Sequence, residues 1–399
     1  MREYLFVLLV GFVATFLTVP AIRALAVRVG AFTPVRDRDV HAVPIPRLGG
    51  VAILVGYAAA TLAASRLPYL SQVFTGPELL GVLGGGALVC AIGAWDDIHE
   101  LDALTKLGGQ LVAAGILAFS GVQLFSLPLG VVTVLPAPVL VLMTIFVVVL
   151  SINAVNFVDG LDGLAAGIVA IAAAAFFAYT YTLGHLFDPP NVFGASTFIS
   201  AALLGCCLGF LPHNVYPARL FMGDSGALLL GLLLAAATIS TTGAVDPSQV
   251  SANPIAATLL PIAVPASIML LPLLDVVLAV VRRLARGQSP WQADRQHLHH
   301  RMLEIGHGHR RAVLLLWLWA LVIAAGAVGF VVLLHLILLA GDYIGGKPTI
   351  GGKPHLEPAV RPLGKLHAPL GVFAVLGNHD NGHWGPIVFA AQPSWPPPT

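Results

Sequence analysis

The stretch SINAVNFVDGLDGLAAG, residues 151–167, decides how the chain folds and where it acts. Four polar side chains recur in it at every third position: Asn153, Asn156, Asp159 and Asp162. Apolar runs lie on both sides, VLVLMTIFVVVL at 139–150 and AAGIVAIAAAAFF at 165–177. Such runs are typical of helices that cross a membrane, where polar and ionisable side chains are costly and usually functional. The stretch therefore predicts two membrane helices with a functional turn between them.

The composition is that of an integral membrane protein. Hydrophobic residues make up 57% of the 399 residues and charged residues only 10%, and the mean hydropathy is +0.89. A water-soluble domain needs more charge to cover its surface. The net charge of +1 is uninformative about partners, and we expect no nucleic acid among them. The cysteines lie in apolar segments and are interpreted as packing residues: Cys90, Cys206 and Cys207.

Apolar runs of about 20 residues predict an all-α fold, a polytopic membrane bundle of about ten transmembrane helices. The first run is too long for a signal peptide and lacks a cleavage motif, so it is predicted to be a spanning helix. The predicted spans lie near 4–26, 48–66, 79–96, 104–121, 133–153, 163–183, 195–211, 225–242, 260–281 and 312–339.

Basic residues are divided unevenly between the two sides of these spans. One side has Arg2 and Arg66, whereas the loops after odd-numbered spans hold the larger set. By the positive-inside rule the larger set is cytoplasmic and the N-terminus lies outside. The polar clusters also fall on the cytoplasmic side, which predicts one active site on that face. The basic residues assigned to it are Arg28, Arg36, Arg38, Arg47, Lys106, Arg219, Arg282, Arg283, Arg286, Arg295, Arg301, Arg310 and Arg311.

Two carboxylates, Asp96 and Asp97, stand where the third span should end. The C-terminus of a helix already carries partial negative charge, so a positive group must offset them. Lys106 is one candidate, and a divalent cation with its bound phosphate is another. The alternative is a solvated acidic cap at the membrane surface.

The oxygen-bearing side chains of the opening stretch suit a hard cation such as Mg²⁺, which usually shares the phosphates of a substrate. Hydrogen bonds between helices explain one or two of these residues equally well. Asp224, between Gly223 and Ser225 before an apolar run, is open to two interpretations. It caps a helix, or it holds a metal whose phosphate ligand approaches the helix N-terminus.

The last predicted cytoplasmic loop contains HLHHR at 297–301. The spacing of its histidines does not match that of a zinc-binding helix, and no cysteine lies near them. Histidine and arginine together suit a diphosphate or a lipid phosphate, because arginine binds phosphate through two hydrogen bonds. A basic anchor for anionic lipids is the alternative.

Five motifs together resemble those of the polyprenyl-phosphate N-acetylhexosamine-1-phosphate transferases. The resemblance covers residues 1 to about 335, and QHLHHRM is similar to the WecA-like branch that uses UDP-N-acetylglucosamine. The excess of arginine over lysine suggests an actinobacterial type, with decaprenyl phosphate as the lipid. The motifs are RDRDVHAVPIPRLGG at 36–50, the Asp96–Asp97 pair with LDALTKLGGQ at 101–110, NAVNFVDGLDGLAAG at 153–167, FMGDSGALLLG at 221–231 and HLHHR at 297–301.

The resemblance implies transfer of N-acetylglucosamine 1-phosphate from UDP-N-acetylglucosamine to decaprenyl or undecaprenyl phosphate in a bacterial inner membrane. UMP is released, and synthesis of a cell-envelope polysaccharide begins. It also implies Mg²⁺, with Mn²⁺ as an alternative, and leaves a homodimer open.

The same resemblance implies a role for each matching residue. Asp224 would hold the cation with Asn156 as a second ligand, and Asp96 and Asp97 would serve the lipid phosphate. The implied catalytic residues are Asp96, Asp97, Asp159, Asp162 and Asp224. The implied substrate-binding residues are Lys106, Asn153, Asn156, His297, His299, His300 and Arg301.

The tail, residues 336–399, differs from the transferase domain at 1–335. GDYIGG at 341–346 and APLGVFAVLGNHD at 368–380 resemble two motifs of calcineurin-like metallophosphoesterases. So short a tail cannot supply that domain, and we expect it to be disordered and catalytically silent.

Two other functions remain open at this point. One is the transfer of phospho-N-acetylmuramoyl-pentapeptide by the neighbouring branch, which usually has three consecutive histidines where this chain has HLHH. The other is a polytopic anion transporter without enzymatic activity. A transporter should have repeated halves and a site near the middle of the membrane, which this sequence does not show.

Overall fold

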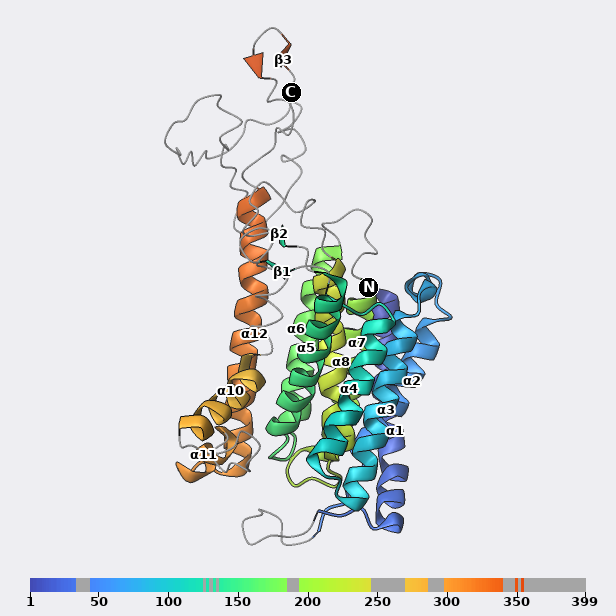
Figure 1. Cartoon of the computed structure of the whole chain (residues 1–399), viewed down its shortest axis with the longest axis vertical. Helices are drawn as coiled ribbons and strands as arrows, with labels where there is room; N and C mark the ends of the chain where they lie inside the picture. Colours follow the sequence, from blue (N-terminus) through green and yellow to red (C-terminus); the bar gives the residue numbers. More distant parts are fainter. Residues whose placement is uncertain are drawn as a thin grey trace, which may run out of the picture. The chain divides into compact units, whose positions relative to one another are not determined.

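A computed structural model describes residues 1–33, 44–124, 127–128, 132–133, 136–184, 194–244, 270–285, 298–339, 349–350 and 353–354. These residues are mostly helical, which confirms the predicted all-α class (Figure 1). The helices are α1 (Arg2–Val29), α2 (Gly49–Ala64), α3 (Glu78–His99), α4 (Ala103–Phe119), α5 (Ala137–Val158), α6 (Leu164–Gly184), α7 (Gly194–Asn214), α8 (Gly223–Ala244), α10 (Leu270–Ala285), α11 (Leu298–Glu304) and α12 (His309–Leu339).

Short elements complete the described part. A 3₁₀ helix, η1, covers Leu70–Thr75. Two antiparallel pairs of two-residue strands are present, β1 (Leu127–Pro128) with β2 (Val132–Thr133), and β3 (Thr349–Ile350) with β4 (Lys353–Pro354).

Seven of the described helices are long and apolar enough to cross a membrane: α1, α3, α5, α6, α7, α8 and α12. This confirms a multi-pass membrane bundle. Two further apolar helices, α2 and α4, coincide with predicted spans but are shorter than 18 residues. For the span predicted near 260–281, only the part from Leu270 onward is described, as α10. The total of about ten spans therefore stays a prediction.

Helix α8 forms the centre of the bundle and packs against α2, α3, α5, α6 and α7. Leu229, Leu230 and Leu233 in α8 are completely buried. By contrast, Leu17 in α1 is 66% exposed and Phe146 in α5 is 65% exposed. A helix that is apolar on every side must be enclosed by other helices, whereas large exposed apolar side chains on the outer helices suit contact with lipid.

Glycines allow α2 and α3 to approach the first turn of α8 closely. A Cβ atom on Gly93 of α3 would collide with the backbone of Asp224 and Ser225. A Cβ atom on Gly50 of α2 would collide with the backbone of Ser225 and Gly226. Small residues permit such backbone contact between membrane helices. These two glycines therefore fix the position of the turn that carries Asp224.

Several helix ends meet at one end of the bundle, which we call the site end. Helices α1, α3 and α5 finish there, and α4 and α8 begin there (Figure 1). The segment 44–50 joins them through backbone bonds. Its Arg47 N–H donates to the Ala31 carbonyl oxygen at 2.9 Å, and the Phe221 N–H donates to the Pro46 carbonyl oxygen at 2.9 Å. The segment thus links the end of α1 to the residues just before α8.

The chain divides into two compact units, Met1–Val328 and Gly329–Thr399. Nearly all of the second unit beyond α12 lies outside the described residues. The interpretation of the tail as a metallophosphoesterase fragment, and the predicted boundary at residue 335, both stay predictions.

Candidate active site

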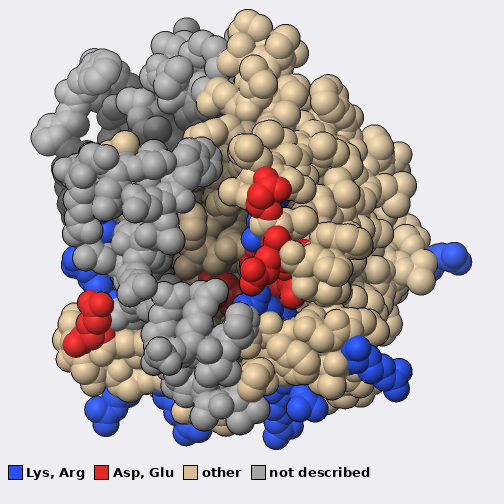
Figure 2. All heavy atoms as spheres, turned by 60° about the horizontal axis from the view of Figure 1, so that its bottom comes forward, with Lys and Arg blue, Asp and Glu red and all other residues tan. Residues whose placement is uncertain are grey.

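A lysine and two carboxylates from three helices form the centre of the site end. The Nζ atom of Lys106 in α4 lies 2.6 Å from Oδ2 of Asp96 in α3 and 2.9 Å from Oδ2 of Asp224 in α8. Lys106 and Asp224 are only part-buried, so both remain accessible from outside the bundle. Figure 2 shows this end of the molecule, where acidic side chains gather beside a recess and basic side chains lie around the margin.

Asp97 caps the N-terminus of α8 from the neighbouring helix α3. Its Oδ1 accepts the Asp224 N–H at 2.9 Å, and its Oδ2 accepts the Ser225 N–H at 3.2 Å. The first N–H groups of a helix lack partners within the helix, and a carboxylate there also complements the helix dipole. The positive groups that offset the acidic pair are therefore Lys106 for Asp96 and the N-terminus of α8 for Asp97. The sequence predicted the first of these and missed the second.

Replacing Asp97 by alanine is expected to lower the free energy of unfolding by about 1–2 kcal/mol, because two helix N–H groups lose their acceptor. Asp97→Asn should cost less than half of that, since its amide oxygen still accepts a hydrogen bond. Thermal unfolding of the purified protein in detergent measures both changes. Equal losses in the two variants would contradict the capping role and assign the effect to the charge of Asp97.

The last turn of α5 and the turn that follows it bring a further amide and carboxylate to the centre. The side chain of Asn156 lies close to the Asp224 carboxylate and interacts with it. Burial and the nearby carboxylates of Asp224 and Asp97 raise the pKa of Asp159 to about 8, and the charge of Arg47 opposes this rise. Burial is the larger cause of this rise, and the negative charge of the neighbouring carboxylates adds to it. A bound cation would offset that negative charge.

Two residues of the opening stretch have other partners in the described structure. Asp162 is 4% exposed, its Oδ2 accepts the Ala218 N–H at 2.9 Å, and its own N–H donates to His309 Nε2 at 3.1 Å. Asn153 donates to Gln110 Oε1 at 2.7 Å and to the Val149 carbonyl oxygen at 2.8 Å. Asp162 thus ties the turn to the start of α12, and Asn153 joins α5 to α4. Their predicted substrate roles stay predictions.

The histidine motif is described only in part. His297 lies outside the described residues, as do the side chains of His299 and His300. The backbone of His299 and His300 belongs to α11, and Arg301 on the same helix is exposed. The predicted contacts of this motif with a sugar phosphate stay predictions.

Several residues of the site end were not among those predicted. Gln110 and His309 bind residues of the opening stretch, as described above. Asn214 Oδ1 accepts the Gly163 N–H at 3.1 Å, and its Nδ2 donates to the Leu220 carbonyl oxygen at 3.0 Å. Each is a polar residue near the end of an apolar run, but their partners lie between 6 and 147 residues away in the sequence. Spacing along the chain therefore carries no signal for these pairs.

The oxygen donors fit a magnesium ion that is partly held by its substrate. In the part of the chain that the structure describes, no group of three or more His, Cys, Asp or Glu side chains forms a metal site. The predicted ligands Asp224 and Asn156 do come together. Mg²⁺ is commonly held by one or two carboxylates, with water and substrate phosphates completing its octahedral shell. This arrangement suits such a shared site.

Comparisons with known proteins agree with the geometry. Residues 79–242 match the family described as glycosyl transferase family 4. The chain is 45% identical over 340 residues to decaprenyl-phosphate N-acetylglucosaminephosphotransferase of Mycolicibacterium smegmatis, with 82% of each chain covered. It is 41% identical to the protein of the same name from Mycobacterium tuberculosis, again with 82% of each covered. It is 32% identical to phospho-N-acetylmuramoyl-pentapeptide-transferase of Desulforudis audaxviator, with 79% of this chain and 94% of that protein covered.

Proposed function

The chain belongs to glycosyl transferase family 4, and from this membership we propose that it transfers N-acetylglucosamine 1-phosphate from UDP-N-acetylglucosamine to decaprenyl phosphate. The two mycobacterial relatives carry that sugar and that lipid in their names, and both are more similar to this chain than the pentapeptide transferase is. The observation that carries the proposal is the meeting of Lys106, Asp96 and Asp224 at one end of a membrane bundle.

The proposed reaction is a phosphoryl transfer. An oxygen of decaprenyl phosphate attacks the β-phosphorus that bears the sugar, and the bond from this phosphorus to the bridging oxygen breaks. UMP leaves with the bonding electron pair, and the product is a lipid-linked sugar diphosphate. A phosphate monoester has a second pKa near 6 and is mostly dianionic at neutral pH, so the nucleophile needs no general base. The protein must instead place the two phosphates in line and offset their charge.

Different residues at the site end would bind the cation, bind phosphate and hold α8 in position. We propose that Asp224 and Asn156 hold Mg²⁺, with Mn²⁺ as an alternative. The bound ion would supply charge neutralisation at the diphosphate. Lys106 is accessible and carries a flexible ammonium group, which would bind a phosphate oxygen in place of one of its present carboxylate partners. Asp97 would keep the N-terminus of α8, and therefore Asp224, in place.

We also propose that the site end faces the cytoplasm of a bacterium and that the protein lies in the inner membrane. Exposed Arg28, Arg301, Arg310 and Arg311 lie in or next to the helices that start or finish at that end. Basic residues are retained on the cytoplasmic side of membrane proteins. A cytoplasmic site would also have direct access to a soluble sugar nucleotide.

The test is release of UMP by purified full-length protein given UDP-N-acetylglucosamine, decaprenyl phosphate and Mg²⁺. We expect release that requires the lipid. Release with UDP-N-acetylmuramoyl-pentapeptide but not with UDP-N-acetylglucosamine would overturn the sugar assignment. No release with either donor, from protein that unfolds cooperatively on heating, would overturn the function.

Chelation of divalent cations is expected to abolish this release, since Lys106, which already lies between the carboxylates of Asp96 and Asp224, cannot offset the charge of the substrate phosphates without the cation. Addition of Mg²⁺ in excess of the chelator should restore the rate, and Mn²⁺ should restore a part of it. The rate is measured as UMP formed after dialysis against EDTA. A rate that persists at full value in EDTA would contradict the proposed cation.

A further inference from the structure

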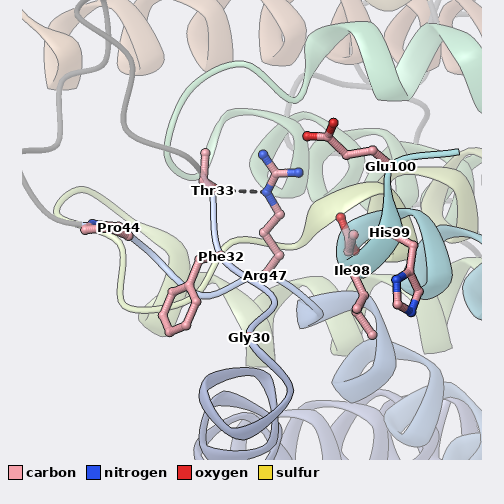
Figure 3. Close-up of a pocket in the computed structure, with 9 residues that line it drawn as sticks. Gly30, Phe32, Thr33, Pro44, Arg47, Ile98, His99 and Glu100 are labelled. Atoms are coloured by element: carbon pink, nitrogen blue, oxygen red, sulfur yellow. Dashed lines mark hydrogen bonds between the residues drawn. The ribbon is translucent and has the colours of Figure 1, made fainter.

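A pocket of about 850 Å³ opens beside the centre of the active site, between the ends of α1 and α3 (Figure 3). Asp97 contributes to its lining and, through its bonds to α8, also belongs to the active site. None of the roles assigned above uses this pocket. The other side chains that matter here are Phe32, Thr33, Arg47, Ile98, His99 and Glu100.

The backbone that carries Arg47 is held on both sides. Its N–H donates to the Ala31 carbonyl oxygen, and two residues later the Gly49 N–H donates to the Phe221 carbonyl oxygen at 3.0 Å. Leu48, which follows Arg47, has a φ of 88° and is 3% exposed. A left-handed conformation is unfavourable for a non-glycine residue, and it persists only where the surroundings hold it. The position of Arg47 is therefore fixed by the fold.

The side chain of Arg47 lines the pocket and is close enough to the acidic centre for its charge to act there. Its Nε atom donates to Thr33 Oγ1 at 2.8 Å, as Figure 3 shows. Its charge also acts on Asp159, which lies in the turn after α5. The hydrogen bond to Thr33 uses one of the five N–H groups of the guanidinium, and among the described residues it is the hydrogen bond that Arg47 donates through its side chain. Arginine is well suited to bind phosphate through such N–H groups.

The walls of the pocket are partly apolar at the level where two spanning helices end. Phe32 and Ile98 line the pocket and are each 36% exposed. Trp95 does not line the pocket, but its exposed ring lies tilted against that of the lining residue His99. The pocket also contains the carboxylates of Asp97 and Glu100, so an anion bound here would depend on Arg47 for charge. A ligand with a phosphate head and an apolar tail fits these walls better than a wholly polar one.

We propose that this pocket is a phosphate-binding subsite of the transferase and that Arg47 is its phosphate ligand. The inference rests on the proposed function, because both substrates of that reaction carry phosphate. The apolar walls favour the lipid phosphate as the group bound. Thr33 is a positioning residue, since it acts through Arg47.

The test is steady-state kinetics of the full-length enzyme carrying Arg47→Gln, with each substrate varied in turn at saturating levels of the other. We expect the KM for decaprenyl phosphate to rise about 10- to 100-fold, the equivalent of a hydrogen-bonded charge, with a smaller change in kcat. Arg47→Lys keeps the positive charge but loses the planar guanidinium group that can bind phosphate through two N–H groups. The KM of this variant for decaprenyl phosphate should therefore fall between those of the wild type and Arg47→Gln. Thr33→Val should raise the same KM by about threefold, the equivalent of one neutral hydrogen bond.

Arg28→Gln is the matched control. Arg28 lies exposed in the last turn of α1 and does not line the pocket. Its replacement by glutamine removes one positive charge from the site end, as Arg47→Gln does. A rise in the KM for UDP-N-acetylglucosamine instead of the lipid would keep the phosphate subsite and assign it to the nucleotide. If Arg47→Gln changes neither KM more than Arg28→Gln does, in a wild-type enzyme that is active, the subsite is wrong while the proposed function stands. An inactive wild type would overturn both.

Discussion

Replacement of Asp224 by asparagine is expected to reduce kcat by about 1,000-fold, the size of effect seen when a principal charge-stabilising group is removed from an active site. The Asp224 carboxylate lies 2.9 Å from the ammonium group of Lys106 and interacts with the side chain of Asn156. An amide of the same shape cannot offset the charge of a metal ion. The rate of UMP release at saturating levels of both substrates measures kcat.

The fold should survive this change. The centre of the site already holds more carboxylates than cations among its described residues, so the loss of one negative charge removes repulsion. We expect the free energy of unfolding to change by less than about 1 kcal/mol. A kcat above about a tenth of the wild-type value would contradict the central role given to Asp224.

Asp102→Asn is the matched control for Asp224→Asn. Asp102 is an exposed carboxylate at the same end of the bundle, and its Oδ2 accepts the N–H groups of Leu104 and Thr105 at 3.1 Å. Those bonds cap α4, and the hydroxyl of Thr105, which donates to Oδ1 at 2.6 Å, is the largest cause of the lowered pKa of Asp102. Asparagine caps a helix about as well as aspartate, so kcat should stay within about twofold of the wild type.

Replacement of Gly93 by alanine is expected to damage stability and activity together. The added Cβ atom would meet the backbone of Asp224 and Ser225, which cannot give way as the tip of a side chain can. Overpacking of this kind costs about 1–3 kcal/mol. Displacement of the first turn of α8 would also move Asp224, and a shift of about 1 Å at a reacting centre costs about 100-fold in rate. Thermal unfolding in detergent and kcat/KM measure the two effects.

Gly84→Ala provides the comparison in the same helix. A Cβ atom on Gly84 would meet nothing within 4 Å, and the residue is exposed. Alanine is favoured over glycine in a helix by up to about 1 kcal/mol, so this variant should unfold at the same temperature or higher and keep its activity. If Gly93→Ala behaves like Gly84→Ala, the close approach of α3 to α8 does not control the site.

The order of the apolar runs was enough to predict a polytopic helical bundle, because a membrane forces every span to satisfy its own backbone hydrogen bonds. The ends of those runs also indicated where the polar clusters lie. Asp96, Lys106 and Asp224 were predicted individually, and the structure brings them together from three helices. Lys106 was one of two candidates for the positive partner of the Asp96–Asp97 pair, the other being a divalent cation, and the structure pairs Lys106 with Asp96.

The tertiary structure alone decided what each of these groups contacts. Asp97 caps a helix that begins 126 residues later, and Asp162 accepts a hydrogen bond from the Ala218 N–H while its own N–H donates to His309. Arg47, one of many basic residues in the sequence, lines a pocket next to Asp97.

The physical reason for this division is distance along the chain. The apolar character of a span and the hydrogen bonds of its backbone are properties of that one segment, so they can be predicted from its own sequence. Capping across helices, and the position of a guanidinium group next to a carboxylate, depend on how spans pack. That packing is set here by close contacts at glycines such as Gly50 and Gly93, whose partners in α8 lie more than 100 residues away.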